Sequence, residues 1–264
     1  MTTALSRRRR VIGFGLFTLF MVACFIGLGI WQLQRRVEKH ALIAALDMRL
    51  AAAAVALPPP AQWRALTPAR DEFRRVEFTA TYQKLPDAMV YSAGSAVRDD
   101  VSGSGTWAFL PAQLPAGETI VINAGFVPNT MQDRSYQDRV VGRLVTGAPA
   151  KLTGYLRFPE SAGALTPAED PAKRLWFTRD HFAMARALGW NAAGQAVAPF
   201  YIDLETPVPE SGVPKPGPLT VHLKDDHLQY AITWFALAGA VVIAFGVWMR
   251  GQRRHQVAAG SGWF

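Results

Sequence analysis

The chain has 264 residues, half of them hydrophobic, a single cysteine and a formal net charge of +8. Seven of its 28 Lys and Arg lie in the two end tails, which hold no acids, so 21 remain against all 20 acids elsewhere. This distribution argues against a nucleic-acid-binding protein, because no basic stripe interleaved with aromatic residues is present between the tails. The lone Cys24 excludes an internal disulfide and a cysteine-based zinc or redox site.

Two uncharged, apolar segments lie near the ends of the chain. The first runs from Val11 to Gln34, and the second holds 22 residues from Leu228 to Met249. About 20 such residues cross a hydrocarbon core of roughly 30 Å as a helix. The sequence therefore predicts transmembrane helices at 11–31 and 227–249. A cleaved signal is disfavoured, since the first segment is too long, lacks an A-x-A site and continues apolar past Cys24.

The arginines of the two tails predict the orientation of these helices. Short flanks rich in Arg stay on the cytoplasmic side of a membrane, whereas a long domain crosses largely regardless of its charge. Both tails, 1–10 and 250–264, are therefore expected to be cytoplasmic and the central domain exported. The short Arg-headed amino end leaves little room for a mitochondrial presequence, so we expect a bacterial inner membrane and a periplasmic domain.

The region between the two spans divides into three parts. Residues 32–60 keep helical spacing until the prolines of LPPP, which predicts a helical extension with a proline-rich stop. Residues 61–206 are expected to form a β-rich domain, and 207–226 a proline-rich connector, a short strand and a helix cap. An exposed helix is predicted over RDHFAMARALG, ending at Gly189.

Alternating apolar residues and short β-prone runs give seven candidate strands, separated by Gly, Pro and Asp clusters. They are RRVEFTATY, DAMVYS, TWAFLPA, ETIVINAGFV, KLTGYLRF, PFYIDL and LTVHL. The predicted fold is therefore an α+β membrane protein, in which two transmembrane helices flank an antiparallel β-barrel or sandwich with a few helices.

Catalytic signatures are absent from the sequence. It has no H-E-x-x-H, G-x-S-x-G, phosphate loop or C-x-x-C, and SGSG at 102–105 is interpreted as a loop. His40, His181 and His255 are expected to be solvated. The run HLKDDH, from His222 to His227, leaves open a divalent-metal cluster.

His227 stands at the predicted start of the second span, after two acids that suit a helix N-cap, Asp225 and Asp226. Helical spacing places Tyr230, Ala231 and Trp234 on its face, with Ala238 below. An axial ligand, a small gap and large aromatic side chains would suit a flat macrocycle, with His227 binding haem iron. An aromatic belt at the membrane interface is the alternative interpretation of Tyr230 and Trp234.

Antiparallel spans bring the exit of the first helix to the same membrane surface as His227. His227 should therefore lie at about the same depth in the membrane as four residues of the first helix: Trp31, Gln32, Arg35 and Arg36. The two arginines could pair with the propionates of a haem, because guanidinium binds carboxylates well. Anchoring of the helix at the interface is the alternative role for this basic face.

Four segments carry a resemblance to a known family: GLGIWQLQRRVEK, VINAGFVP, GYLRFPE and HLQYAITWFALAG. In order and spacing they resemble the Surfeit locus protein 1 family over nearly the whole chain. The resemblance implies an assembly factor for cytochrome c oxidase that acts with haem a, with His227 at the position associated with haem binding. The family commonly has Asn-Arg-Gly-Trp at Asn123–Phe126 and Asn at Asp226, so this chain departs from it at both places.

The resulting hypothesis is a two-span protein that binds or delivers haem a and is not an enzyme. The resemblance implies oxidase subunit I as partner, with haem a synthase as a second candidate, beside membrane lipid; self-association stays open. A haem-independent membrane scaffold that stabilises an oxidase assembly intermediate is the main alternative. An exported membrane-anchored hydrolase is the third and weakest of these hypotheses.

Overall fold

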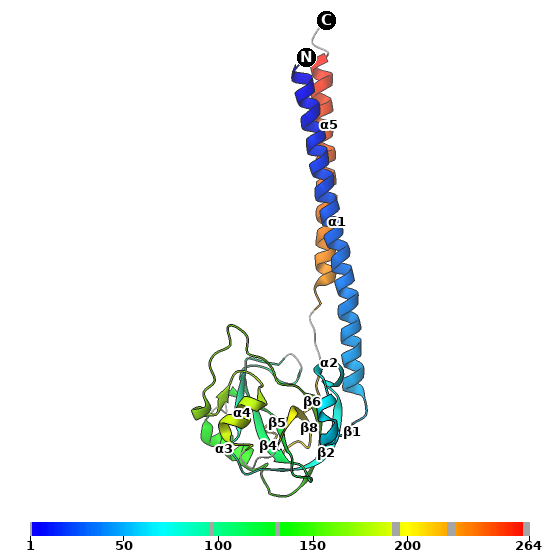
Figure 1. Ribbon diagram of the computed structural model, residues 1–264. Helices are drawn as coiled ribbons and strands as arrows, with labels where there is room; N and C mark the ends of the chain where they lie inside the picture. The colour runs from blue at the N-terminus through cyan, green and yellow to red at the C-terminus, as the bar shows by residue number, and fades with distance from the viewer. Residues whose placement is uncertain (1, 96–97, 130–132, 192–195, 221–224, 261–264) are drawn as a thin grey trace. The chain divides into compact units, whose positions relative to one another are not determined.

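The computed structural model describes residues 2–95, 98–129, 133–191, 196–220 and 225–260, with backbone only at 2–8, 10 and 253–260. Contacts divide the chain into two compact units. Residues 1–44 and 223–264 form the first, which we call the helix pair. Residues 45–222 form the second, the β domain. Each unit is described by itself below, and Figure 1 labels their elements.

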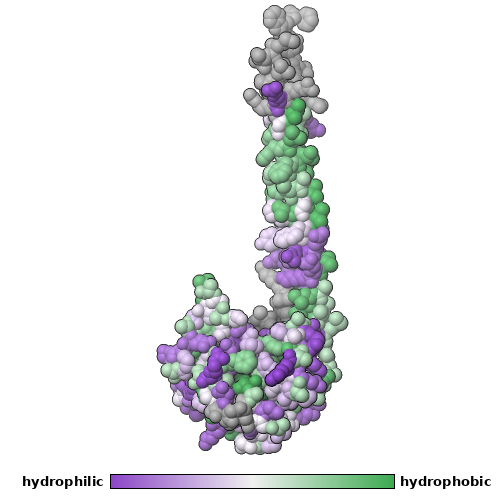
Figure 2. Space-filling view, in the orientation of Figure 1, coloured by the Kyte–Doolittle hydropathy of each residue, from purple (hydrophilic) through white to green (hydrophobic). Residues whose placement is uncertain are grey.

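The helix pair consists of two long helices that lie side by side (Figure 1). They are α1, Thr2–Ala51, whose last turns belong to the β domain, and α5, His227–Gly260. Both helices are long and apolar enough to cross a membrane. Large apolar side chains along them face outward, and Figure 2 shows this apolar surface on the middle of the pair. Such an outward apolar face is what a helix in lipid requires.

Small residues let the two helices approach each other. A Cβ added at Gly29 of α1 would lie 2.6 Å from the ring of Phe235, so that ring packs on the bare glycine backbone. Ala231 and Ala238 of α5 are almost fully buried. Close packing through small residues is the usual way in which helices associate in a membrane.

The β domain contains eight strands, three short α-helices and two 3₁₀ turns among the residues described. The strands are β1 Val55–Ala56, β2 Arg75–Tyr82, β3 Ala88–Ser92, β4 Gly105–Gln113, β5 Thr119–Pro128, β6 Ala150–Arg157, β7 Leu175–Trp176 and β8 Val197–Thr206. The helices are α2 Pro68–Asp71, α3 Arg134–Gly142 and α4 His181–Leu188, and the 3₁₀ turns are Pro60–Ala65 and Pro171–Lys173.

These strands form one sheet in the order β1-β2-β6-β8-β5-β4-β3-β7, with an additional pairing of β2 with β4. The five strands β2, β6, β8, β5 and β4 therefore follow one another in a closed circuit of paired neighbours. The sheet is mixed, because β5 pairs with β8 in parallel, as do β1 with β2 and β3 with β7. The expectation of a purely antiparallel sheet was wrong: β5 reaches β8 through a long connection, which permits parallel pairing.

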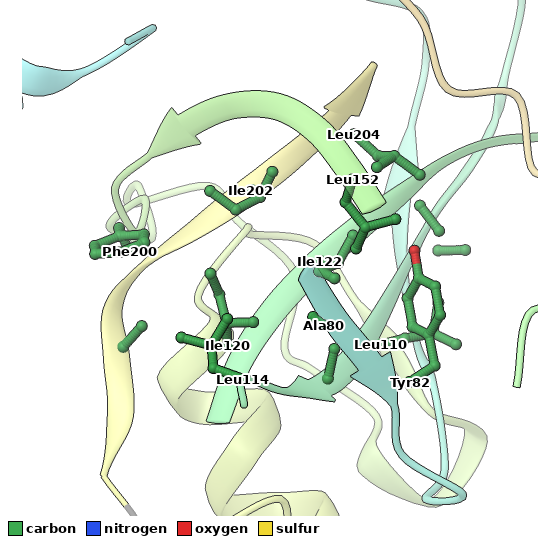
Figure 3. Packing of buried hydrophobic residues seen from close by; sticks show 14 of the residues in the cluster. Ala80, Tyr82, Leu110, Leu114, Ile120, Ile122, Leu152, Phe200, Ile202 and Leu204 are labelled. Carbon is green, nitrogen blue, oxygen red and sulfur yellow. The ribbon is translucent and has the colours of Figure 1, made fainter. Parts of the chain in front are cut away.

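Apolar side chains from the strands of this circuit meet in one interior. Figure 3 shows Ala80 and Tyr82 of β2, Ile120 and Ile122 of β5 and Leu152 of β6 pointing toward one another. Burying a side chain such as Leu or Ile stabilises a fold by about 1.5–3 kcal/mol. The alternation seen in the sequence of β2 is thus explained, since Val76, Ala80 and Tyr82 are buried on one face.

Six of the seven predicted strands are confirmed, from β2 through β6 and in β8. The seventh, LTVHL, has Leu219 and Thr220 outside any strand, and its remaining residues lie outside the part described. The helix α4 is confirmed, with Gly189 in the left-handed conformation at its end, φ 72°. Gly125 lies inside β5 with φ 127°, and Pro128 is the last residue of that strand.

The predicted extension of α1 as far as LPPP was wrong. The helix ends at Ala51, and Val55–Ala56 pair in parallel with Val76–Glu77 of β2. The amide of Leu57 then donates to the carbonyl of Glu77 at 3.1 Å. Leu57 precedes a proline, which disfavours the helical conformation there, and the edge of β2 supplies backbone hydrogen bonds to this segment instead.

His181 was expected on an exposed helix, and this expectation was also wrong. Its side chain is fully buried at the start of α4, where Nε2 donates to the carbonyl of Ala198 at 3.0 Å. Nδ1 has no hydrogen-bond partner within the described residues. Burial lowers the pKa of His181 to about 4, against the opposing effects of the Ala198 carbonyl and the Asp180 carboxylate.

A buried polar cluster crosses the sheet between β5, β8 and β6. Asp203 accepts from Asn123 Nδ2 at 2.6 Å and from Arg157 Nη1 at 2.8 Å. Arg157 also donates to Glu72 at 3.1 Å and lies 4.5 Å from the ring centroid of Phe73. Buried charges are tolerated only when they are paired in this way, so the cluster fixes how the three strands align.

Candidate functional site

The first turn of α5 is held by the two aspartates that precede it. The Asp226 carbonyl accepts from the amide of Tyr230 at 3.1 Å, which begins the helical hydrogen-bond ladder. The side chain of Asp225 accepts from the backbone amide of His227 through Oδ1 at 3.0 Å. A carboxylate here satisfies an otherwise unpaired amide and favours the positive end of the helix dipole.

Asp225 also connects α5 to α1. Its Oδ2 lies 2.7 Å from His40 Nε2 and 3.8 Å from Arg36 Nε. Burial alone would raise the pKa of Asp225, but hydrogen bonds from the His227 amide and the His40 imidazole hold that pKa below its usual value. The carboxylate is therefore ionised at neutral pH and ties the start of one helix to the side of the other.

The ring of His227 makes a second connection between the helices. His227 Nδ1 lies 2.7 Å from Oε1 of Gln32, an amide oxygen that can only accept. A neutral ring that donates from Nδ1 can make this hydrogen bond, and in that tautomer Nε2 has the lone pair. Nε2 has no hydrogen-bond partner among the residues that the structure describes. This arrangement leaves the half-buried imidazole one nitrogen that can bind a metal ion.

Two other residues predicted to share the His227 face have different surroundings. Tyr230 is 55% exposed. Trp234 stacks on Phe25 of α1, with ring centroids 5.7 Å apart and an angle of 24° between the planes. The expectation of a small gap over Ala231 and Ala238 was wrong, since both are buried where the helices pack together. Tyr230 is therefore an exposed aromatic side chain within one helical turn of His227.

The basic residues of α1 separate onto two faces. Gln32, Arg36 and His40, spaced by four, face the start of α5. Arg35 instead pairs with Glu38 at 2.8 Å, and its guanidinium lies 5.9 Å from the ring centroid of Trp31. Both helices thus contribute to one polar site of Gln32, Arg36, His40, Asp225 and His227, which we call the polar end. Trp31 and Arg35 lie on the neighbouring face of α1.

Sequence reasoning assigned no role to two members of this site. His40 was expected to be solvated, and its side chain is indeed 54% exposed, yet it binds Asp225. Gln32 was placed near His227 in depth without a function. The signal that could have found them is the i, i+4, i+8 spacing of Gln32, Arg36 and His40, which puts three polar side chains on one helix face.

The structure gives no support to the two other candidate sites, the metal cluster at HLKDDH and a nucleophile at SGSG. No group of three or more His, Cys, Asp or Glu side chains that could hold a metal ion occurs in the described part of the chain. His222, the first residue of HLKDDH, lies outside that part. The run SGSG leads into β4 and includes no helix, whereas a nucleophile elbow requires a strand-to-helix turn.

Comparison with known proteins identifies the family. The SURF1 family model matches residues 19–239. Surfeit locus protein 1 of Rattus norvegicus is 32% identical over 237 residues, which are 85% of this chain and 72% of the rat protein. The Homo sapiens protein of the same name is 31% identical over 226 residues, 81% of this chain and 70% of its own length.

A third relative carries a similar name and is similar to this chain over a region of comparable length. The SURF1-like protein of Monosiga brevicollis is 31% identical over 233 residues, which are 85% of this chain and 82% of that protein. The matched region of the family contains the β domain, Gln32 and the first turns of α5 with His227. The resemblance found in the sequence is therefore confirmed, and the chain belongs to the SURF1 family.

Proposed function

We propose that this protein is an assembly factor for cytochrome c oxidase and that it binds haem a, or delivers it to oxidase subunit I, at the polar end of the helix pair. Membership of the SURF1 family supports the oxidase role. The observation that carries the haem role is the position of His227, whose Nδ1 lies 2.7 Å from Oε1 of Gln32, a contact that a ring with its lone pair on Nε2 can make. A neutral imidazole held in this way is a common axial ligand of haem iron.

The surroundings of His227 fit such a cargo. Tyr230 is exposed one turn below, where its ring could lie against a porphyrin edge. Arg36 is on the same face of α1 as Gln32, and its 3.8 Å distance from Asp225 leaves it close to the site, so it is the better placed arginine for a propionate. Arg35 is already paired with Glu38. Haem would supply the iron; the chain's own residues would bind and orient it.

In this proposal α1 and α5 span a bacterial inner membrane. Both tails are cytoplasmic and the β domain is periplasmic, where it docks on oxidase subunit I, with haem a synthase as a second candidate partner. No bond in the cargo is broken, so the protein is not an enzyme. Both tails contain arginines and no acidic residues, and this charge supports the orientation.

The haem role is tested by the colour of the purified protein. The full chain is produced in cells that make haem a, purified in detergent, and its absorption spectrum recorded beside that of His227→Ala. We expect bound haem in the wild type and its loss in the variant. His255→Gln is the matched control: it removes an imidazole of the carboxyl-terminal tail, which is not a member of the polar end, and should retain haem.

A colourless wild type under these conditions would favour the haem-independent scaffold, which holds an oxidase intermediate through the β domain. The two arginines are compared by Arg36→Gln and Arg35→Gln, of which the first should release haem more readily. Orientation is tested by reporter fusions at Pro60 and Val257. These should report opposite sides of the membrane, and the two-span topology fails if they report the same side.

A further inference from the structure

We propose that Gln32 is the positioning residue of His227: its side-chain oxygen accepts the Nδ1 proton and so fixes the tautomer and ring orientation in which Nε2 is the metal-binding nitrogen. The inference concerns a residue of α1 that lies 195 positions away from His227 in the chain. Its consequence for metal binding rests on the proposed haem role. The tautomer of His227 itself can be measured without haem.

The atoms that meet in this contact determine which group donates the hydrogen bond. The 2.7 Å distance joins the ring nitrogen to the amide oxygen of Gln32, which has lone pairs and no proton to give. An imidazole that donates from Nδ1 cannot also carry the proton on Nε2 while it is neutral. The contact is partly buried, and a hydrogen bond is stronger where water is scarce.

A second contact holds the backbone of the same residue. The His227 amide donates to Asp225 Oδ1 at 3.0 Å, and Asp225 Oδ2 is bound by His40 of α1 at 2.7 Å. Main chain and ring are therefore both tied to α1, through His40 and through Gln32. With both ends fixed, the ring can rotate little about its Cβ–Cγ bond, so the direction of the Nε2 lone pair is set before any ligand arrives.

Positioning of this kind has known consequences at metal-binding histidines. A partner on the second ring nitrogen fixes the tautomer and raises the basicity of the ligating nitrogen, and its loss commonly weakens metal binding about 10- to 100-fold. A purely structural link between the helices would contribute to helix pairing without setting the tautomer. Only a measurement of the ring itself separates these two roles.

The experiment uses the full chain in detergent micelles with ¹⁵N-labelled histidine and no haem. The ring nitrogen shifts of His227, assigned by comparison with His227→Ala, report which nitrogen carries the proton. We expect the Nδ1–H form in the wild type. Gln32→Leu, nearly the same size but without an acceptor, should lose this preference, whereas Gln32→Glu should keep it.

Gln34→Leu is the matched control, because Gln34 is an exposed glutamine two residues further along the same helix. It should leave the His227 signals unchanged. Should Gln32→Leu fail to fold, Gln32→Asn serves in its place, since its amide is one methylene shorter and cannot make the contact. A wild-type His227 in the Nε2–H form, or a Gln32→Leu protein that keeps Nδ1–H, overturns the inference.

The second readout is titration of the same proteins with ferric haem b. We expect Gln32→Leu to bind at least about 10-fold more weakly than the wild type, with Gln32→Glu and Gln34→Leu close to it. Gln32→Glu should also lower the reduction potential of bound haem, because a carboxylate makes the imidazole a stronger electron donor.

The two readouts fail separately. If no protein binds haem b and the wild type purified from cells that make haem a is also colourless, the proposed haem role fails, while the tautomer assignment can still be confirmed. If Gln32→Leu changes the tautomer but binds haem as the wild type does, positioning by Gln32 is wrong and the haem role of His227 stands.

Discussion

The β domain and the helix pair use histidine in opposite ways. In the domain, His181 is fully buried and donates from Nε2 to a backbone carbonyl. In the helix pair, His227 is half-buried, and its Nδ1 lies 2.7 Å from a side-chain oxygen of the other helix. The first arrangement stabilises a fold, because both the ring and its partner are enclosed. The second engages Nδ1 of a half-buried ring and leaves Nε2 outside that contact, as the proposed role in ligand binding requires.

The two units also differ in where their charged groups lie. Asp203 and Arg157 are enclosed in the domain, with 7% and 8% of their side chains exposed. At the polar end, Asp225 is 15% exposed, while its partners Arg36 and His40 are 39% and 54% exposed. Buried pairs are costly to break and exposed ones are not. Substitutions should therefore affect global stability in the domain and local order at the polar end.

The largest effect is expected from Asp203→Ala. This change leaves Arg157 buried with only Glu72, which is itself 28% exposed, and leaves the side chain of Asn123 without its acceptor. Removing one partner of a buried ion pair costs about 3–5 kcal/mol of unfolding free energy. Urea unfolding of the full chain in detergent, followed by near-ultraviolet circular dichroism, measures the loss.

Glu77→Ala is the matched control for that substitution. Glu77 pairs with Lys151 across β2 and β6, as Asp203 pairs with Arg157 across β8 and β6, but these side chains are 44% and 73% exposed. Its removal should cost less than about 1 kcal/mol. Equal effects of the two substitutions would show that enclosure does not distinguish the two pairs.

A smaller effect is expected from the titration of His181. Its pKa is about 4 in the fold, below the ordinary value of 6.5, so the unfolded chain binds a proton at a higher pH than the folded chain does. The contribution of the neutral His181 ring to the free energy of unfolding is therefore complete above pH 6.5 and is lost as the pH falls from 6.5 to 4. A pKa difference of this size corresponds to about 3 kcal/mol at most.

His181→Gln removes this titration and keeps an N–H donor for the Ala198 carbonyl. The unfolding free energy of the wild type should fall more steeply between pH 6.5 and 4 than that of the variant. Carboxylates titrate in both proteins, so the difference between the two curves isolates the histidine. Parallel curves would mean that the ring of His181 takes up a proton equally easily in the folded and unfolded chains.

Much of this contrast could be predicted from the sequence, because strong local patterns decided it. The charge-free runs gave both long helices, and the alternation of Val76, Ala80 and Tyr82 predicted β2. The start of α5 at His227 followed from two aspartates before an apolar run. These features depend on residues close together in the chain, whose physical preferences all agree.

What the sequence could not show depends on contacts between distant segments. Nothing near His181 predicts that β8 would cover α4, and Val55–Ala56 became a strand only because β2 offered an edge. The parallel pairing of β5 with β8 has the same origin. The contact of Gln32 with His227 needed the exact rotation of two helices about their axes, which composition does not fix.

The smallest effect is expected at the polar end, from Asp225→Ala. The change removes the acceptor of the His227 amide and the partner of His40, but it leaves no enclosed charge behind. Loss of a carboxylate that satisfies a first-turn amide costs about 0.5–2 kcal/mol, confined to that turn. Unfolding of the β domain should not change.

Hydrogen exchange measures this local loss directly. The His227 amide should exchange roughly five- to tenfold faster in Asp225→Ala, as a cost of about 1 kcal/mol implies, whereas amides in the middle of α5 keep their rates. Asp225→Asn retains an acceptor oxygen without the charge and should lie between the two proteins. An unchanged His227 amide would mean that the first turn of α5 is held by Gln32 and the helix ladder alone, and the two helices would then be joined through the ring of His227 rather than through its backbone.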